Sequence, residues 1–251
     1  MSDSRAVLVT GGSRGIGRAI AHAFAAAGDR VAVHWGASRE RAEAVLAQLP
    51  GDGHVLVQAD LADADAVGRM VDDAAAALGG LDVLVNNAGV FTAHPPLSVS
   101  YEEWQAAWSR TLAVNLLGAA NATFRAVPHL VAAGGGAVVN VSSRGAFRGE
   151  PDTPAYGASK AGLNAFGQSM AIALAPHGIS VGTVAPGFVQ TEMAREVLDG
   201  PGGDAVRAQS PYGRVARPEE VASAVLWLAS PGARFSTGTI IDVNGASYLR
   251  S

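Results

Sequence analysis

Residues 6–17 read AVLVTGGSRGIG, and this stretch decides the fold class. The run from Ala6 to Thr10 is short and almost entirely apolar, as expected of a parallel strand buried on both faces. A turn with Gly11, Gly15 and Gly17 follows, and residues 18–27 have helical character. Glycines at these positions let the backbone turn tightly and approach a pyrophosphate at the helix N-terminus. The stretch therefore predicts a phosphate-binding strand–turn–helix unit.

The same alternation of strand and helix continues along the rest of the chain. Further strands are predicted at residues 30–35, 54–58, 81–85, 137–141, 179–184 and 239–243. Helices are predicted at residues 40–49, with Ser38 as N-cap, and at 63–78, 101–132, 156–175 and 218–228. This order predicts an α/β fold with a single doubly wound parallel sheet (Rossmann-type) of about seven strands and helices on both faces. No linker interrupts the pattern, so we expect one domain over residues 1–251.

Composition narrows the class of protein. Of the 251 residues, 49% are hydrophobic and 16% charged, which is typical of a globular protein with a substantial core. A net charge of −4 without a basic run gives no electrostatic support for nucleic-acid binding. There is no cysteine, and the six histidines lack ligand spacing, so no metal site is expected. The polar start and the lack of a membrane-length apolar run predict a cytoplasmic protein without membrane contact.

Two irregular stretches are candidates for substrate contact. Residues 145–154 precede a predicted helix, and residues 186–213 are rich in glycine and proline with scattered apolar residues. Long loops in a compact domain are usually binding loops or lids. Ligands of open parallel sheets bind beyond the carboxyl ends of the strands. We therefore expect a substrate loop or lid around residues 186–213.

The stretch YGASKAG at residues 156–162 contains the chain's most informative pair. The chain has 18 lysine plus arginine residues, and Lys160 is the only lysine. Lysine differs from arginine in its compact ammonium and its adjustable pKa. On a helix, residues i and i+4 share a face, so Lys160 lies beside Tyr156 and lowers the pKa of the phenol towards the range of a general acid or base. The alternative is that Tyr156 packs in the core and Lys160 is a solvated surface charge.

The ordered motifs resemble the short-chain dehydrogenase/reductase family over residues 7–245. TGGSRGIG at residues 10–17 resembles that family's TGxxxGxG turn, and NNAG at residues 86–89 its NNAG segment. Tyr156 and Lys160 match its YxxxK pair, while Ser143 and Asn115 match the remainder of its catalytic tetrad. The chain is most similar to the 3-oxoacyl-(acyl carrier protein) reductase branch. It departs from the family in the tail, where residues 244–246 read NGA instead of the commoner DGG, which leaves subunit packing open.

The resemblance implies hydride transfer between a nicotinamide cofactor and a carbonyl or alcohol carbon. Tyr156 is expected to donate the proton, Ser143 to hydrogen-bond the reacting oxygen, and Lys160 to bind the nicotinamide ribose. Asn115 is expected to support a water that connects Lys160 to solvent. Structural alternatives stay open, with Ser143 as a cap or strand-end residue and Asn115 as a mid-helix polar residue.

The expected cofactor contacts come from the glycine turn, the strand ends, the active-site pair and a capping loop. They are Gly11, Ser13, Arg14, Gly15, Ile16, Gly17, Trp35, Ser38, Arg39, Asp60, Leu61, Asn87, Ala88, Gly89, Tyr156, Lys160, Pro186, Gly187, Val189 and Thr191.

The end of the second strand predicts the choice of cofactor. An acidic residue there would accept a hydrogen bond from the ribose 2′-OH of NAD(H), but no carboxylate appears before Glu40. Arg14 and Arg39 suit a 2′-phosphate, so NADP(H) is favoured and NAD(H) is possible.

We therefore expect an NAD(P)-dependent oxidoreductase that acts on a small-molecule ketone, 3-oxoacyl group or secondary alcohol. The resemblance also implies a homo-oligomer, specifically a homotetramer. The alternative is a catalytically silent nucleotide-sensing protein of the same fold. Arg144 and Arg148 lie near Ser143, where they either meet an anionic substrate or face solvent.

Overall fold

The computed structural model describes residues 4–250, which form one parallel sheet with the strand order β3-β2-β1-β4-β5-β6-β7. This is the Rossmann-type sheet predicted from the sequence. The strands are β1 (Ala6–Val9), β2 (Arg30–Trp35), β3 (Val55–Gln58), β4 (Val83–Asn86), β5 (Gly136–Val141), β6 (Ile179–Pro186) and β7 (Ile240–Val243). Every pair of neighbouring strands is parallel.

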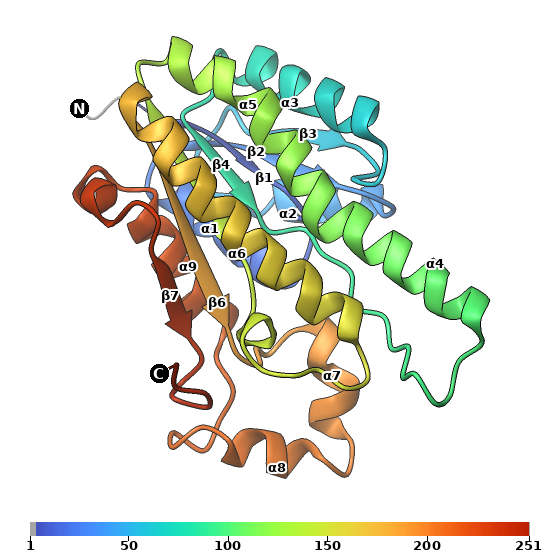
Figure 1. Cartoon of the computed structure of the whole chain (residues 1–251). Coiled ribbons are helices and arrows are strands. Elements are labelled where there is room, and N and C mark those ends of the chain that lie inside the picture. The colour runs from blue at the N-terminus through green and yellow to red at the C-terminus, as the bar shows by residue number, and fades with distance from the viewer. Residues whose placement is uncertain (1–3, 251) are drawn as a thin grey trace.

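Helices cover both faces of this sheet (Figure 1). One face packs against α1 (Gly15–Ala26), α2 (Arg39–Leu46) and α9 (Pro218–Leu228). The other packs against α3 (Ala64–Leu78), α5 (Gly118–Ala132) and α6 (Pro154–Leu174). Each face therefore has its own hydrophobic core.

Strand β1 has an uninterrupted apolar sequence because both of its faces are buried. Successive side chains of a strand point to opposite faces. Val7 and Val9 accordingly pack in the core beneath α1, whereas Ala6 and Leu8 pack in the core beneath α3. All four residues of β1 are buried, so a polar residue at any of them would lose its water without gaining a partner.

The predicted helix at residues 101–132 is real but not uniform. Helix α4 (Tyr101–Leu112) runs into α5 along one continuous path in Figure 1, and a π-helical turn at Ala113–Leu117 joins them. Such a turn holds one extra residue, and π-turns occur frequently at functional sites. The turn contains Asn115, which the sequence identified as a candidate catalytic residue.

The expectation of an irregular segment at residues 186–213 was wrong in part. It contains two short helices, α7 (Glu192–Asp199) and α8 (Gly203–Ala208), which lie beyond the carboxyl end of β6 (Figure 1). Helix α7 begins with an acidic residue at its positive end and buries Leu198, and Gly200 ends it. The cluster at residues 200–203 (GPGG) forms the break between the two helices and the start of α8, whereas Pro186, Gly187, Pro211 and Gly213 lie before α7 or after α8.

Across residues 4–250, no helix combines the length and apolar character that a bilayer crossing requires.

Candidate active site

A cavity of about 550 Å³ opens beyond the carboxyl ends of β1 and β4. The connection after β1 leads to β2 on one side, and the connection after β4 leads to β5 on the other side. α/β sheets bind ligands at such a point. Most of the predicted cofactor contacts line this cavity. They are Gly11, Ser13, Arg14, Gly15, Ile16, Gly17, Ser38, Asp60, Leu61, Asn87, Ala88, Gly89, Tyr156, Lys160 and Thr191.

The two ends of the glycine turn pack closely against each other. A Cβ added at Gly17 would lie 2.1 Å from the Gly11 carbonyl oxygen, so only glycine allows the first turn of α1 to pack this closely. The Asn87 side chain then ties the turn to β4, because its amide donates to the carbonyls of Thr10 at 2.8 Å and Gly11 at 3.2 Å. Asn87 thus holds the phosphate-binding turn in shape, in addition to lining the cavity.

His34 is a cavity residue that the sequence interpretation missed. Its Nδ1 accepts the Gly11 N–H at 2.9 Å, which leaves Nε2 as the donor to the Ala59 carbonyl at 3.1 Å. Burial lowers the pKa of His34, so the ring stays neutral and Nδ1 remains an acceptor. This histidine therefore links the glycine turn to the segment that follows β3.

Tyr156 lines the cavity, and the Ser143 hydroxyl lies close enough to its phenol to act on the phenol's pKa. Burial raises the pKa of Tyr156; the Ser143 hydroxyl lowers it by less, and the charge of Glu150 raises it further. We had expected a pKa lowered by Lys160, and that expectation was wrong. Desolvation of the phenolate exceeds the favourable contributions here, so Tyr156 holds its proton at neutral pH.

Lys160 is buried, with 4% of its surface exposed, so it is not the solvated surface charge of the alternative interpretation. Its ammonium donates to the Val141 carbonyl at 2.8 Å. Burial lowers the pKa of Lys160 to about 8. At neutral pH the group is therefore a mostly charged ammonium that can release a proton within the physiological range.

Hydrogen bonds of its side chain connect Asn115 to the site. Its Oδ1 accepts the Val90 N–H at 2.8 Å, while Nδ2 donates to the Val90 carbonyl at 3.0 Å and to Ser159 Oγ at 3.1 Å. The amide thus joins the segment after β4 to the helix that carries Tyr156. Neither Asn115 nor Ser143 lines the 550 Å³ cavity itself.

Comparison with known proteins identifies the family. A family model described as enoyl-(acyl carrier protein) reductase matches residues 11–246. The chain is 37% identical over 251 residues to the 3-oxoacyl-[acyl-carrier-protein] reductase of Staphylococcus aureus strain Mu50, covering 99% of this chain and 100% of that protein. The chain belongs to the short-chain dehydrogenase/reductase family.

Two further similarities broaden the comparison. The cis-4-hydroxycyclohexanecarboxylate dehydrogenase of Sinomonas cyclohexanicum is 40% identical over 243 residues, covering 96% of this chain and 95% of that protein. A crystal structure of a short-chain dehydrogenase from Burkholderia cenocepacia in complex with NADP has a TM-score of 0.88 and 38% identity, covering 97% of each chain. These similarities support an oxidoreductase that uses a nicotinamide nucleotide.

The cavity of this short-chain dehydrogenase/reductase fits such a nucleotide in its backbone geometry. A Cβ at Gly15, where φ is 53°, would lie 3.3 Å from Thr191 Cγ2, and one at Gly89 would lie 3.5 Å from Lys160 Nζ. Side chains at these glycines would narrow both ends of the cavity. Ser13 and the N-terminus of α1 also line it, which supplies backbone N–H groups for phosphate.

Several predicted contacts lie elsewhere. Arg39 bonds Glu43 at 2.8 Å on the exposed side of α2. Trp35, Pro186, Gly187 and Val189 do not line the cavity. Strand pairing and burial account for three of them, because Trp35 pairs with Gln58, Pro186 pairs with Val243, and Val189 is 5% exposed and bridges Ala216.

Arg41, and not Arg39, is the arginine of α2 that lines the cavity. Residues two apart on a helix lie about 200° apart around its axis, so Arg41 faces the cavity when Arg39 faces away. Arg41 also binds Glu192 of α7 at 3.0 Å across the mouth of the cavity. Helical periodicity from the Ser38 cap was the signal that could have identified it.

Apart from Arg41, the cavity-lining residues that the sequence analysis did not predict have no sequence pattern that marks them as such. Arg110 is the clearest, because it reaches from α4 to bind Asp60 at 2.9 Å. The missed residues are His34, Gly36, Ala37, Arg41, Ala59, Val90, Arg110, Val114, Val141, Ser142, Glu192 and Met193.

His94 supports the helix that carries Tyr156, although it lies far from that helix in sequence. Thr153, the N-cap of α6, makes no side-chain capping bond. The Ala155 N–H instead donates to His94 Nε2 at 3.2 Å, while Nδ1 of the same ring donates to the Thr92 carbonyl at 2.7 Å. His94 is 1% exposed. It therefore caps the helix one residue before Tyr156.

Proposed function

We propose that this chain is an NADP(H)-dependent carbonyl reductase that reduces a ketone or 3-oxoacyl group to a secondary alcohol. The observation that carries the proposal is that Tyr156 and Lys160 line the cavity one helical turn apart, with the Ser143 hydroxyl close enough to the phenol to act on its pKa. The phenol is protonated at neutral pH, so it can donate a proton to the oxygen of a bound carbonyl group.

Each residue of the group has a distinct role in the proposed reaction. The nicotinamide cofactor, when bound, supplies the hydride that reaches the carbonyl carbon. Tyr156 Oη gives its proton to the carbonyl oxygen, so the oxygen becomes a hydroxyl. Ser143 donates a hydrogen bond to the same oxygen and stabilises the negative charge that develops on it. Lys160 would hold the ribose hydroxyls of the cofactor.

Three observations support NADP(H) as the cofactor. Arg14 and Arg41 both line the mouth of the cavity, and Ser38 adds a hydroxyl. The carboxylates there, Asp60 and Glu192, are each bound to an arginine, so neither is an unpaired acceptor for a ribose 2′-OH. The similar Burkholderia protein was crystallised with NADP.

The surroundings of Tyr156 support a substrate with an apolar body. Phe91 packs edge-on against the Tyr156 ring with 4.9 Å between centroids, and 47% of its surface is exposed. An aromatic wall beside the proton donor suits an acyl chain or a ring. The names of the similar proteins include one substrate of each kind, a 3-oxoacyl group and a hydroxycyclohexane.

The test is NADPH oxidation by the purified protein, followed at neutral pH against a panel of ketones, oxoacyl thioesters and quinones. We expect turnover with at least one ketone or oxoacyl substrate and its loss in Tyr156→Phe. If the protein binds NADPH tightly and oxidises it with none of the panel, the nucleotide-sensing alternative is favoured.

We also propose that the protein is a cytoplasmic homo-oligomer, as expected from the family resemblance. Large apolar side chains lie exposed on α5 and α6, with Phe124 at 79% and Ile172 at 81%. Apolar groups of this size usually mark an interface when they gather on one face. Light scattering should give a mass above that of the monomer, and Phe124→Glu together with Ile172→Glu should lower it. A monomeric wild-type protein would contradict this proposal.

A further inference from the structure

Arg144, directly after the catalytic serine, is a buried cation whose hydrogen-bond acceptors are neutral. Only 4% of its surface is exposed. Its guanidinium donates to Ser247 Oγ at 2.7 Å and to Gln209 Oε1 at 2.6 Å, and it stacks on the Phe188 ring with 5.0 Å between Cζ and the centroid. No carboxylate of residues 4–250 forms an ion pair with it.

Arg144 lines a second cavity of about 190 Å³. This cavity lies between the segment after β5, the end of α8 and the segment after β7. It shares no lining residue with the nucleotide cavity over the described part of the chain. Its walls also include Phe188, Ser210, Tyr212, Asn244 and Ser247.

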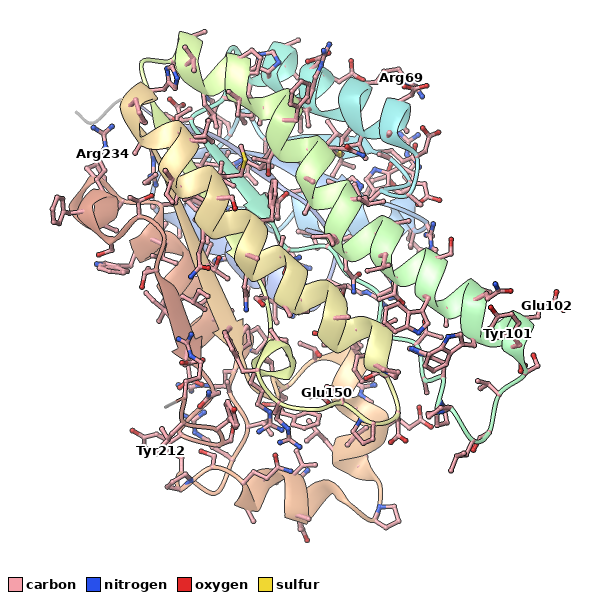
Figure 2. All side chains as sticks on the ribbon, viewed as in Figure 1. Arg69, Tyr101, Glu102, Glu150, Tyr212 and Arg234 are labelled. Carbon is pink, nitrogen blue, oxygen red and sulfur yellow. The ribbon has the colours of Figure 1, made fainter. Side chains whose placement is uncertain are left out.

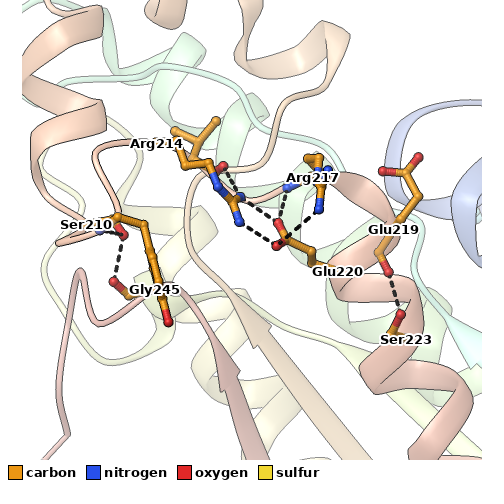
Figure 3. Close-up of polar contacts among 9 residues, drawn as sticks. Ser210, Arg214, Arg217, Glu219, Glu220, Ser223 and Gly245 are labelled. Carbon is orange, nitrogen blue, oxygen red and sulfur yellow. Dashed lines mark hydrogen bonds and ion pairs between the residues drawn. The ribbon is translucent and has the colours of Figure 1, made fainter.

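The other charged groups of this second cavity already have partners. Arg214 binds Glu220 at 2.7 Å, and Glu220 also accepts the Arg217 N–H at 2.7 Å (Figure 3). Asp242 is bound by Arg250 at 2.7 Å. Ser210 donates to the Gly245 carbonyl at 2.8 Å in the same wall. Arg144 is therefore the one lining charge without an ion pair among residues 4–250. The nearby Glu150 forms no ion pair with it but raises its pKa, whereas burial and the like charge of Arg148 lower that pKa.

A buried charge without an ion pair is costly, and a carboxylate in direct contact compensates it well. Removal of a guanidinium from water without an ionic partner is unfavourable, even when neutral acceptors satisfy some of its donors. Its planar fork of N–H groups matches the two oxygens of a carboxylate. The cavity provides space next to that fork for a small anion.

The position of Arg144 places such an anion close to the catalytic machinery. Ser143 has extended backbone angles, φ −163° and ψ 154°, so neighbouring side chains point in opposite directions there. Ser143 thus faces Tyr156 while Arg144 faces the second cavity. Phe188, which covers the guanidinium, directly follows Pro186 and Gly187 at the end of β6.

From these observations we propose that the second cavity is a binding site for a small carboxylate, with Arg144 as its principal ligand. The carboxylate comes either from the substrate, as a group remote from the reacting carbonyl, or from a separate molecule that acts as an effector. Both sources share the same recognition by the guanidinium, and the kinetic experiment below distinguishes them.

The first experiment measures binding without turnover. The melting temperature of the full chain is followed with increasing acetate, propionate or benzoate, against sodium chloride at equal ionic strength. A ligand that binds only the folded state raises the melting temperature in a saturable manner. We expect this rise in the wild-type protein and a loss of affinity of about tenfold to a hundredfold in Arg144→Gln.

A second variant keeps the test decisive if Arg144→Gln fails to fold. Gln209→Glu has almost the same shape and places a carboxylate 2.6 Å from the guanidinium, where it supplies the missing counter-charge. It should abolish the response to added carboxylates while the protein stays folded. Gln168→Glu on the exposed surface of α6 makes the same change in net charge and should respond as the wild type does.

Two outcomes of the binding experiment would overturn the site. One is a wild-type melting temperature that carboxylates do not raise beyond the chloride control. The other is a Gln209→Glu protein that still binds carboxylates with wild-type affinity.

The kinetic arm rests on the proposed reductase activity and identifies the source of the carboxylate. Inhibition by acetate or benzoate that is competitive with the ketone indicates a substrate group, and a change in kcat without competition indicates an effector. If the protein has no reductase activity, no inhibition can be measured in the kinetic experiment, but the melting temperatures would not change. The two proposals therefore fail separately.

Discussion

Lys160 Nζ lies 5.8 Å from the centroid of the Tyr156 ring and donates to the Val141 carbonyl at 2.8 Å. The two residues are one helical turn apart on α6, and Val141 ends the strand before Ser143. The lysine therefore ties the catalytic helix to the end of β5, which is where the sheet and the cofactor cavity meet. Five predictions follow from this and the neighbouring contacts.

Replacement of the Tyr156 hydroxyl should remove catalysis and little else. Tyr156→Phe keeps the ring and its contact with Phe91, so the fold and the NADPH dissociation constant should hardly change. Loss of a general acid costs about 10²–10⁴ in rate. The measurement is kcat for the best substrate of the panel. Tyr101→Phe, on a side chain that projects from the outer end of α4 (Figure 2), is the matched control and should behave as the wild type. Near-normal turnover in Tyr156→Phe would refute the proposed role.

The lowered pKa of Lys160 predicts a pH dependence of cofactor binding. The ammonium loses its proton around pH 8, far below its ordinary value of 10.5. Binding that requires the charged form should weaken as pH rises through about 8. The NADPH dissociation constant, measured from pH 6 to 10, should show this transition. Lys160→Arg, whose guanidinium does not titrate in this range, should lack it. An unchanged transition in that variant would assign it to another group.

The positions of Arg39 and Arg41 predict which arginine selects NADPH. Arg41 lines the cavity mouth and Arg39 is bound to Glu43 on the outside of α2. A partly exposed charge-assisted contact is worth about 1.5–3 kcal/mol. Arg41→Ala should therefore raise the KM for NADPH at least tenfold and leave that for NADH nearly unchanged, as measured by steady-state kinetics with both cofactors.

Arg39→Ala is the matched control for this prediction, since it removes the same charge from the same helix. It should leave both KM values near those of the wild type. The assignment is wrong if Arg39→Ala has the larger effect on NADPH or if Arg41→Ala harms both cofactors equally.

His34 predicts that stability declines in mild acid. Burial lowers its pKa in the folded state from the ordinary 6.5, so the unfolded chain binds the proton more readily. The contribution of this neutral ring is complete above pH 6.5 and is lost as pH falls through the lower folded-state value. Urea unfolding at pH 7.5 and pH 5 should show the decline, and His34→Asn should reduce it. A pH dependence that survives in His34→Asn would come from other groups.

His94 predicts a defect in the catalytic helix from a distant substitution. His94→Phe keeps an aromatic ring against Trp104 but leaves the Ala155 N–H without its acceptor. A buried donor without a partner costs about 1–3 kcal/mol. We expect a lower melting temperature and a lower kcat, with an unchanged NADPH dissociation constant. His94→Gln offers a carbonyl oxygen in place of Nε2 and should restore part of kcat. A kcat in His94→Phe equal to that of the wild type would show that the cap does not position Tyr156.

The sequence by itself determined the sheet, the nucleotide turn and the four candidate catalytic residues. The apolar runs of β1 and β4 can be stable only when buried on both faces, and this requirement is local to each run. Gly11, Gly15 and Gly17 impose the turn through sterics between neighbours in the chain. Tyr156 and Lys160 share a face because the helical repeat places them there.

Only the tertiary structure decided the electrostatics and the longer-range contacts. The pKa of Tyr156 is raised because burial outweighs the lowering effect of the Ser143 hydroxyl, and burial depends on the whole fold. Whether Arg41 or Arg39 lines the cavity depends on which side of α2 faces it. His94 and Ala155 meet although 61 positions separate them, and no sequence pattern links them. Contacts of this kind arise from how the helices and loops pack on the sheet, which local propensity does not specify.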